Sequence, residues 1–202
     1  AGVRCYPTIK DVPEPVDTAL VLVPAASVEG VLEECAAAGA RSAIVFSSGF
    51  AEMGEEGRKA QKRIANLALN AGMPVLGPNC LGVINLFDNI PLSFSSILDI
   101  GALRSGGIAF VSQSGALATF VLGVAQEARI GFSYWVTTGN EASLEASAVV
   151  RYLLRDERVS GVLLYMEEAR DPRGLMEAGD LARALGKPLI CLNVGRSRSG
   201  KR

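Results

Sequence analysis

Small and polar residues follow an apolar run at residues 110–118, where they could bind an anion. The run at 108–111 is typical of a short strand and residues 114–127 of a helix, so a tight turn and a helix start lie between them. A helix N-terminus presents free N–H donors and about half a positive charge, which together favour a phosphate group. An ordinary helix cap would use the same residue types. The candidate phosphate-binding residues are Ser112, Gln113, Ser114, Gly115 and Ala116.

A second turn-forming stretch covers residues 77–85. Gly77 and Pro78 predict a tight exit from a strand, and the side chain of Asn79 offers both a hydrogen-bond donor and an acceptor. The simpler interpretation is a plain turn with Asn79 in the left-handed region. Cys80 carries a nucleophilic thiol, but the chain has no histidine to activate it, so we interpret it as a structural cysteine.

The 202 residues contain no histidine. This excludes a Ser-His-Asp triad, a Cys-His pair and an imidazole metal ligand within them, and we expect no metal site. The 4 cysteines are widely spaced, which argues against zinc and disulfide frameworks and indicates a cytoplasmic protein. A net charge of −1 gives no field that attracts nucleic acid. The apolar runs are too short to cross a membrane.

Strand-like and helix-like segments alternate along the chain, and the strands are continuously apolar. With 49% hydrophobic and 20% charged residues, this pattern predicts an α/β fold whose parallel sheet is covered by helices on both faces. In such sheets ligands bind beyond the carboxyl ends of the strands. In the first half we expect strands at 18–23, 43–46 and 74–76, and helices at 28–38, capped by Ser27, and at 55–70.

An irregular stretch at 85–104 follows, which we interpret as a linker or an excursion. Both ends of the sequence look cut. The first strand lacks the glycine-rich βα unit that usually opens a nucleotide-binding sheet, and residues 195–202 stop in a loop. In the second half we expect strands at 108–111, 132–136, 161–166 and 188–193, and helices at 114–127, 143–154 and 173–185.

The stretches at 77–85 and 110–118 are two of several short motifs that follow one another along the chain. Each motif is weak alone, but together they resemble the nucleoside-diphosphate-forming acyl-CoA synthetases and, more distantly, the α subunit of succinyl-CoA synthetase. The resemblance covers essentially the whole chain. The further motifs are Val23-Pro24-Ala25, Ser48-Gly49-Phe50, Gly139-Asn140-Glu141-Ala142 and Gly195-Arg196-Ser197.

The resemblance implies two domains. Residues 1–100 would form a CoA-binding Rossmann-like domain without its first βα unit. Residues 103–202 would form a flavodoxin-like, doubly wound ligase domain that ends before the phosphohistidine loop. The histidine would follow the motif at 195–197, outside these residues, and we favour truncation over an inactive homologue as the reason for its absence.

The resemblance also implies an activity. The family forms an acyl-CoA from a carboxylic acid, CoA and ATP or GTP, through an acyl phosphate and a phosphohistidine, and releases ADP or GDP and phosphate. The nucleotide, with Mg²⁺, would bind an ATP-grasp domain or a β-type subunit that this chain lacks. We expect an oligomer. The acid and the choice between ATP and GTP stay open.

Site residues follow from the same resemblance. Glu167 aligns with a glutamate that holds the histidine ring, and its neighbour Glu168 should point to the opposite face of an extended strand. The turn at 139–141 lies beside the acyl group or is only a turn, and the basic residues of 196–202 steer phosphates or are only a solvated loop. No lysine or arginine stands near the candidate CoA-binding residues. These are Pro24, Ala25, Ser27, Ser47, Ser48, Gly49 and Asn79.

Two other functions remain open. The first is a CoA-binding regulatory portion of a protein acetyltransferase, since such enzymes resemble this family and their ligase-like part can lack the histidine. A loop of the type Ser-His-Thr-Gly after Arg202 would favour the ligase instead. The second is a Rossmann-type protein that binds another nucleotide, which the missing Gly-x-Gly-x-x-Gly pattern disfavours.

Overall fold

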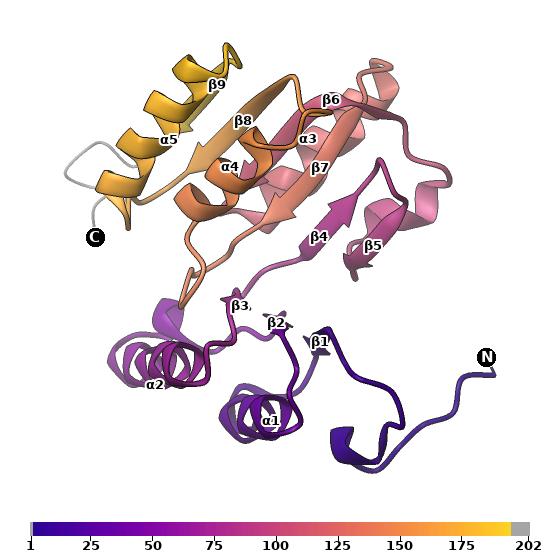
Figure 1. The fold of residues 1–202 in the computed structure, drawn as a ribbon, viewed down its shortest axis with the longest axis vertical. Coiled ribbons are helices and arrows are strands. Elements are labelled where there is room, and N and C mark those ends of the chain that lie inside the picture. Colours follow the sequence, from indigo (N-terminus) through magenta and orange to yellow (C-terminus); the bar gives the residue numbers. More distant parts are fainter. Residues whose placement is uncertain (1, 195–202) are drawn as a thin grey trace.

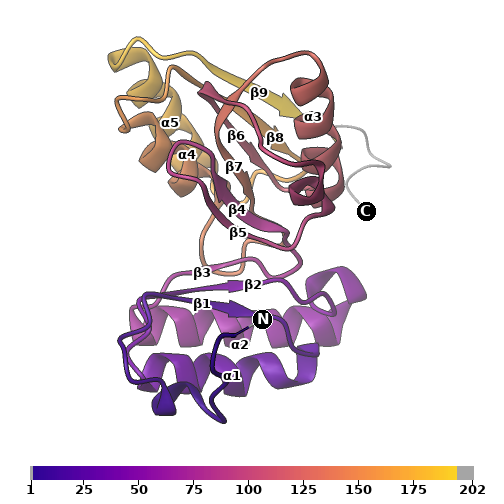
Figure 2. The same ribbon diagram turned by 90° about the vertical axis from the view of Figure 1, so that its right-hand side faces the viewer.

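Two separate β-sheets organise residues 2–194, the part of the chain that the computed structural model describes (Figure 1). The first sheet has three parallel strands in sequential order, β1 (Thr18–Val21), β2 (Ser42–Val45) and β3 (Val75–Leu76). The connecting helices α1 (Ala25–Ala37) and α2 (Glu55–Ala71) lie on the same face of this sheet (Figure 2). Both crossovers run in the same direction across the sheet, and right-handed crossovers in one direction place their helices on one face.

The other face of the first sheet packs toward the larger unit, which corrects the expectation of helices on both faces. Ala43 and Val45 of β2 pack in a cluster with α1 and α2. Ile44 and Phe46 alternate with them and belong to a hydrophobic cluster shared with the larger unit. One buried core therefore crosses the junction between the two units.

The helix α1 begins earlier than expected. Its first residue is Ala25, and Pro24 precedes it with φ −54° and no side-chain cap. Ser27 lies within the first turn, where its N–H donates to the Pro24 carbonyl at 2.8 Å, so Ser27 is not the cap. Proline already has the backbone angle that a helix start needs. Two short 3₁₀ turns belong to this unit: η1 (Ile9–Asp11) precedes β1, and η2 (Ala51–Met53) lies between β2 and α2.

The second sheet has six strands in the order β5-β4-β7-β6-β8-β9. The strands β7, β6, β8 and the edge strand β9 are parallel, whereas β4 is antiparallel to both β5 and β7. The strands are β4 (Gly82–Asn85), β5 (Ile90–Ser93), β6 (Ser105–Ser112), β7 (Phe132–Thr137), β8 (Gly161–Met166) and β9 (Leu189–Asn193).

Helices cover both faces of this second sheet (Figure 2). On one face α3 (Gly115–Glu127) packs in a cluster that includes Phe110 and Trp135. On the other, α4 (Ala146–Leu154) and α5 (Pro172–Ala184) pack on Val111 and Val136. The α/β, doubly wound class is confirmed. Within residues 2–194, none of the helices is both long and apolar enough to cross a membrane.

Residues 82–93 form a β-hairpin, which corrects the interpretation of 85–104 as a linker or an excursion. The hairpin pairs with β7 and extends the second sheet, although it lies within the expected first domain of residues 1–100. Pro91 stands in the edge strand β5, where a missing N–H does not break the ladder. A 3₁₀ turn, η3 (Ser96–Ile100), then leads to β6.

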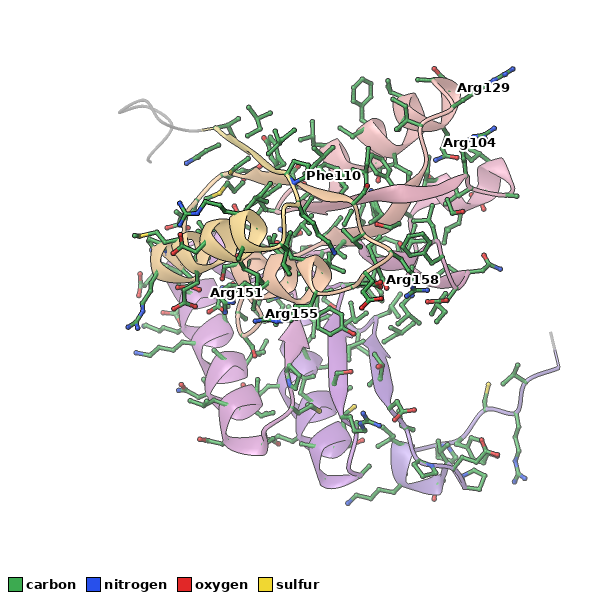
Figure 3. The ribbon with its side chains drawn as sticks, turned by 45° about the horizontal axis from the view of Figure 1, so that its top comes forward. Arg104, Phe110, Arg129, Arg151, Arg155 and Arg158 are labelled. Atoms are coloured by element: carbon green, nitrogen blue, oxygen red, sulfur yellow. The ribbon has the colours of Figure 1, made fainter. Side chains whose placement is uncertain are left out.

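An arginine fixes the turn of this hairpin. Arg158 donates to Asp88 at 3.0 Å, to Asp156 at 2.9 Å and to the Tyr134 hydroxyl at 3.0 Å. Its guanidinium also lies 4.7 Å from the ring centre of Phe87. Figure 3 shows Arg158 at the edge of the larger unit. The hydrogen bonds from Arg158 lower the pKa of both carboxyl groups, with help from Tyr134 at Asp156 and from Asn85 at Asp88.

Replacing Arg158 with alanine should reduce stability most at neutral pH. Both carboxyl groups have folded pKa values below the unfolded value of about 3.9. Their stabilising effect is therefore complete above that pH and is lost as the pH falls through the folded pKa values. Urea unfolding from pH 7 to pH 2 measures the free energy of unfolding of wild type and R158A. The difference between the two should disappear below about pH 4.

Arg155 provides the control, because it lies nearby in sequence and its side chain donates only to the Arg151 carbonyl within residues 2–194. R155A should match wild type across the same range. If the difference in unfolding free energy between R158A and wild type stays constant down to pH 2, the assignment of these ion pairs is wrong.

Candidate active site

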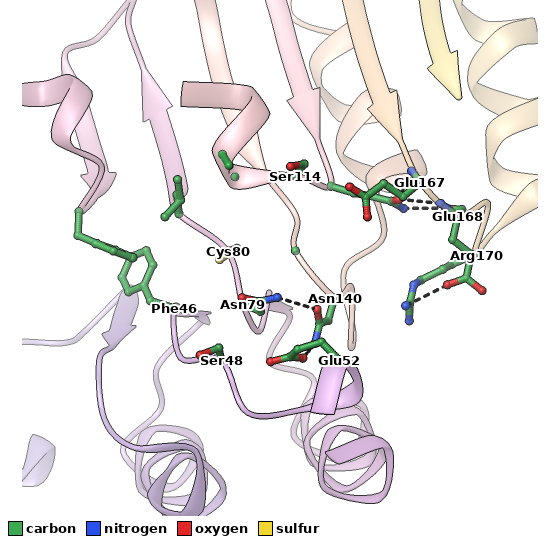
Figure 4. Close-up of a pocket in the computed structure, with 16 residues that line it drawn as sticks. Phe46, Ser48, Glu52, Asn79, Cys80, Ser114, Asn140, Glu167, Glu168 and Arg170 are labelled. Carbon is green, nitrogen blue, oxygen red and sulfur yellow. Dashed lines mark hydrogen bonds and ion pairs between the residues drawn. The ribbon is translucent and has the colours of Figure 1, made fainter. Parts of the chain in front are cut away.

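The carboxyl ends of both sheets border one cavity of about 620 Å³ between the two units (Figure 4). The segments after β2, β3, β6, β7 and β8 line it. Ser48, Glu52 and Asn79 lie on the side of the smaller unit, across from Ser114 and Glu167 (Figure 4). The lining residues are Phe46, Ser48, Glu52, Asn79, Cys80, Leu81, Phe94, Gln113, Ser114, Gly115, Ala116, Gly139, Asn140, Glu167, Glu168 and Arg170.

The start of α3 presents open backbone donors at this cavity. Ser114 caps the helix, and its hydroxyl accepts the N–H of Leu117 at 3.4 Å. Gly115 and Ala116 line the cavity, and their N–H groups have no acceptor within residues 2–194. The helix macrodipole adds partial positive charge at this end. The helix start can therefore bind an anionic group.

Ser112 shapes this turn from inside. It is fully buried, with 0% exposure. Its hydroxyl donates to the Ser114 carbonyl at 2.8 Å and accepts the Ser114 N–H at 3.1 Å. Glycine at 115 allows the turn to approach the opposite wall, because an added Cβ would lie 2.7 Å from Cγ of Leu81. Of the expected phosphate-binding residues, Ser112 alone lies outside the cavity lining.

Glu167 reaches the cavity from the end of β8. Its backbone N–H donates to Oε1 of Gln113 at 2.7 Å. Its carboxylate accepts no hydrogen bond from any group within residues 2–194, and it lines the cavity wall. The carboxylate is therefore available to a donor that enters the cavity.

Glu168 also lines the cavity, and its carboxylate pairs with Arg170 at 3.0 Å. We expected Glu167 and Glu168 to point to opposite faces of an extended strand. That expectation is wrong, because β8 ends at Met166 and the alternation of a strand does not continue past it. Arg170 is the one cation among the lining residues, beside the carboxylates of Glu52, Glu167 and Glu168.

Most residues expected to contact CoA lie along the edge of the smaller unit. A shallow groove of about 360 Å³ adjoins the cavity and shares Phe46, Ser48 and Phe94 with it. Asn79 has a left-handed backbone, as the sequence predicts, with φ 58°. The groove is lined by Pro24, Ala25, Ser47 and Ser48, and the cavity by Asn79. A further hollow between α1 and α2 is lined by Gly49 and Ala25. Ser27 lines none of the three.

Glu52 engages the backbone donors of the loop after β2. Its carboxylate accepts the N–H of Gly49 at 2.6 Å and of Phe50 at 3.1 Å. Burial opposes ionisation of Glu52, but the hydrogen bonds from Asn140 and from these N–H groups outweigh it and lower the pKa of the carboxyl. The Gly49 N–H is thus occupied, so this residue can offer only its carbonyl and its small size to a ligand.

The turn at 139–141 ties the two units together. The N–H of Asn140 donates to the Pro78 carbonyl at 2.9 Å, and its side-chain amide donates to Glu52 at 2.5 Å and to Gln61 at 3.0 Å. Gly139 and Asn140 also line the cavity (Figure 4). The turn therefore sets the distance between the two walls of the site.

The amino-acid sequence matches two known domain families. Residues 1–85 match a CoA binding domain, and residues 105–202 match a succinyl-CoA ligase like flavodoxin domain. The α subunit of ADP-forming acetate–CoA ligase II of Pyrococcus furiosus is 34% identical over 201 residues, 100% of this chain and 43% of that protein. ADP-forming acetate–CoA ligase I of Archaeoglobus fulgidus is 39% identical over 200 residues, 98% of this chain and 28% of that protein. Over its whole length the chain is therefore similar to one part of the NDP-forming acyl-CoA synthetases.

A solved synthetase structure has the same fold. Dinucleotide-forming acetyl-coenzyme A synthetase 1 of Ca. Korarchaeum cryptofilum superposes with a TM-score of 0.87 at 34% identity, covering 98% of this chain and 42% of that one. The same protein has also been solved in complex with phosphate and ADP. The present chain thus spans less than half the length of these synthetases, with 43% as the largest share among the sequence relatives named above.

The cysteine in the turn-forming stretch at 77–85 is structural, as predicted. Cys80 is only 2% exposed, and its thiol donates to the Val45 carbonyl at 3.4 Å. Burial raises the pKa of this thiol to about 12. A thiol that stays protonated near neutral pH is a poor nucleophile.

Several residues of the cavity gave no signal in the sequence. Glu52 lines the cavity from the 3₁₀ turn η2, and Phe94 and Arg170 line it from loops, with no motif or periodicity to single them out. The motif at 195–197 and the basic residues of 196–202 lie outside the described residues. Within residues 2–194 no group of His, Cys, Asp and Glu is arranged to hold a metal ion.

Proposed function

We propose that this chain is the CoA-binding and acyl-transfer portion of an NDP-forming acyl-CoA synthetase. The whole enzyme would form an acyl-CoA from a carboxylic acid, CoA and ATP or GTP, with release of the nucleoside diphosphate and phosphate. One observation carries the proposal: the α3 start and the Glu167 carboxylate line the same cavity as Ser48 and Asn79. An anion-binding turn, an unpaired carboxylate and the CoA-binding edge thus meet at one opening.

The residues divide the chemistry between them. A phosphohistidine outside this chain would bring the phosphoryl group, whose oxygens accept the N–H groups of Gly115 and Ala116. Glu167 would accept the N–H of the other ring nitrogen and so stabilise the cationic imidazole. The carboxylate of the substrate acid takes the phosphoryl group and frees the histidine. The CoA thiol then attacks the acyl carbon of the resulting acyl phosphate, and phosphate leaves.

CoA would approach along the smaller unit. The groove lined by Pro24, Ala25 and Ser47 opens into the cavity at Ser48, so a long ligand can lie in both. Its thiol end would then point toward the α3 start. The sparse positive charge of the groove leaves contacts to the CoA phosphates to residues outside this chain.

A partner completes the proposed enzyme. An ATP-grasp domain or β-type subunit would bind the nucleotide with Mg²⁺, in line with the relative named as a subunit alpha. We expect an oligomer of such units in the cytoplasm, where the free cysteines of the chain would stay reduced. A regulatory portion of a protein acetyltransferase is less favoured, because the relatives described above are named as ligases.

Labelling of the enzyme tests this function. The full-length protein should take up label from γ-labelled ATP or GTP as an acid-labile, base-stable phosphoenzyme. CoA together with a suitable carboxylic acid should discharge it. A protein that binds CoA but takes up no label from either nucleotide would support the regulatory portion instead.

A further inference from the structure

The side chain of Gln113 bridges the ends of two neighbouring strands, β6 and β8. Its Oε1 accepts the N–H of Glu167 at 2.7 Å and of Glu168 at 3.0 Å. Its Nε2 donates to the Glu168 carbonyl at 2.8 Å. The backbone N–H of Gln113 donates to the Tyr165 carbonyl at 3.1 Å. The amide side chain thus continues the hydrogen-bond ladder of the sheet beyond the point where β8 ends.

These contacts change the part that the sequence assigned to Gln113. A phosphate-binding side chain would direct its donor at the cavity. Here the donor and the acceptor of the amide are both engaged with residues 167–168. The backbone that carries Glu167 is therefore held at its N–H and again one residue later, which restricts the direction of its Cα–Cβ bond.

The buried carboxyl group of Glu141 lies near the Gln113 amide. Glu141 is 5% exposed and accepts hydrogen bonds from the Thr138 hydroxyl at 2.7 Å and from the Ala146 N–H at 3.2 Å. Burial raises the pKa of Glu141, while hydrogen bonds from Thr138 and from the Gln113 side chain oppose that rise. The Gln113 amide thus accepts two backbone N–H groups and donates to a carbonyl, and it lines one small hollow together with Glu141. Only a primary amide of this length meets all of these requirements.

We propose that Gln113 is a positioning residue that acts through Glu167. By holding the backbone at 167–168, its amide directs the Glu167 carboxylate into the cavity beside the α3 start. The inference rests on the proposed ligase function, and its distinctive claim is that Gln113 matters for phosphoryl chemistry without touching the phosphoryl group.

A double-mutant cycle in the full-length enzyme tests this claim. Q113A should slow phosphoenzyme formation by about 10-fold to 100-fold, the usual cost of losing a residue that orients a ligating group. In the background of Glu167→Gln the same change should have almost no further effect, because residues that act as one unit are not additive. Equal slowing by Q113A in both backgrounds would overturn the proposal.

Gln126 provides a matched control at the other end of α3. Its Oε1 accepts the Arg104 N–H at 2.6 Å, and its Nε2 donates to the Arg104 carbonyl at 3.4 Å, so it also clamps a backbone segment. Figure 3 shows Arg104 and Arg129 at the end of the larger unit that lies far from the smaller unit. Q126A removes a similar clamp but should leave phosphoenzyme formation at the wild-type rate.

Hydrogen exchange separates this inference from the proposed function. In Q113A the amides of Glu167 and Glu168 should exchange at least about 10-fold faster, as expected for loss of a net hydrogen bond of about 1.4 kcal/mol, while β8 stays protected. If wild type takes up no label but these amides lose protection, the ligase function fails and the clamp stands. Unchanged exchange would refute the clamp.

The isosteric variant Q113E guards against a folding defect. It keeps the volume of the side chain but replaces the Nε2 donor by an oxygen that faces the Glu168 carbonyl and Glu141. Phosphoenzyme formation by Q113E should be at least as slow as by Q113A, while the melting temperature of Q113E stays close to that of Q126A. Wild-type labelling by Q113E would overturn the proposal even if Q113A fails to fold.

Discussion

Replacing Glu167 with glutamine in the full-length enzyme should slow phosphoenzyme formation by about 100-fold or more and leave CoA affinity unchanged. Glutamine keeps the shape of the side chain but removes the charge that would stabilise a cationic imidazole. The fold should survive, because the Glu167 carboxylate holds no hydrogen bond within the described part of the chain. Single-turnover labelling gives the rate, and calorimetric titration with CoA gives the affinity.

The neighbouring glutamate provides a matched control. Glu168 is one residue away, lines the same cavity and pairs with Arg170. E168Q should lose that ion pair, which is exposed and contributes little, and should label at close to the wild-type rate. If E167Q forms the phosphoenzyme at the wild-type rate, Glu167 has no role in phosphoryl transfer. Equal slowing of both variants would show that the cavity responds to total charge rather than to one carboxylate.

Replacing Gly139 with alanine should cause a large loss of stability. Gly139 has φ +57°, and an added Cβ would lie 2.3 Å from the Pro78 carbonyl oxygen and 2.4 Å from that of Asn79. The left-handed backbone alone costs about 1–3 kcal/mol for a residue with a side chain. The clash adds to this cost, because both neighbours are backbone atoms. Urea unfolding should measure the loss.

The same variant should also weaken the site, since the turn at 139–141 joins the two units. Gly179 in α5 is the control, because a Cβ there meets nothing within 4 Å. G179A should raise the unfolding free energy by about 0.5–1 kcal/mol, as alanine restricts the unfolded chain more than glycine does. If G139A unfolds at the same urea concentration as G179A, the close approach of the turn to residues 78–79 is not formed in solution.

The central elements of the fold were predictable because their cause is local. Continuous apolar runs at 108–111, 132–136 and 161–166 predict buried parallel strands, and the structure forms β6, β7 and β8 there. The helix expected at 114–127 begins one residue later, at Gly115, and Ser114, one of the residue types that cap helices, is its cap. Cys80 could be recognised as structural because no histidine was available to activate it.

The hairpin at 82–93 could not be predicted by the same reasoning. Its strands are short, one contains Pro91, and their register comes from pairing with β7, which lies far along the chain. The position of α1 was missed for a similar reason, since Pro24 begins the helix without the side-chain cap that the pattern suggested. Pairing with a distant strand decided the hairpin, and the backbone angle of Pro24 decided the start of α1, so the local preferences of the residues did not suffice in either place.

The sequence by itself determined that this is an α/β chain with a polar helix start after β6, a candidate anion site, and a carboxylate after β8, because strand, turn and helix preferences act over a few residues. Only the tertiary structure decided which of these groups face one another. Glu52, Gln61 and Asn140 meet through hydrogen bonds between the two units. Gln113 meets the backbone at 167–168 because β6 and β8 are neighbours in the sheet. Such pairings depend on strand order, a property of the whole chain that short motifs do not encode.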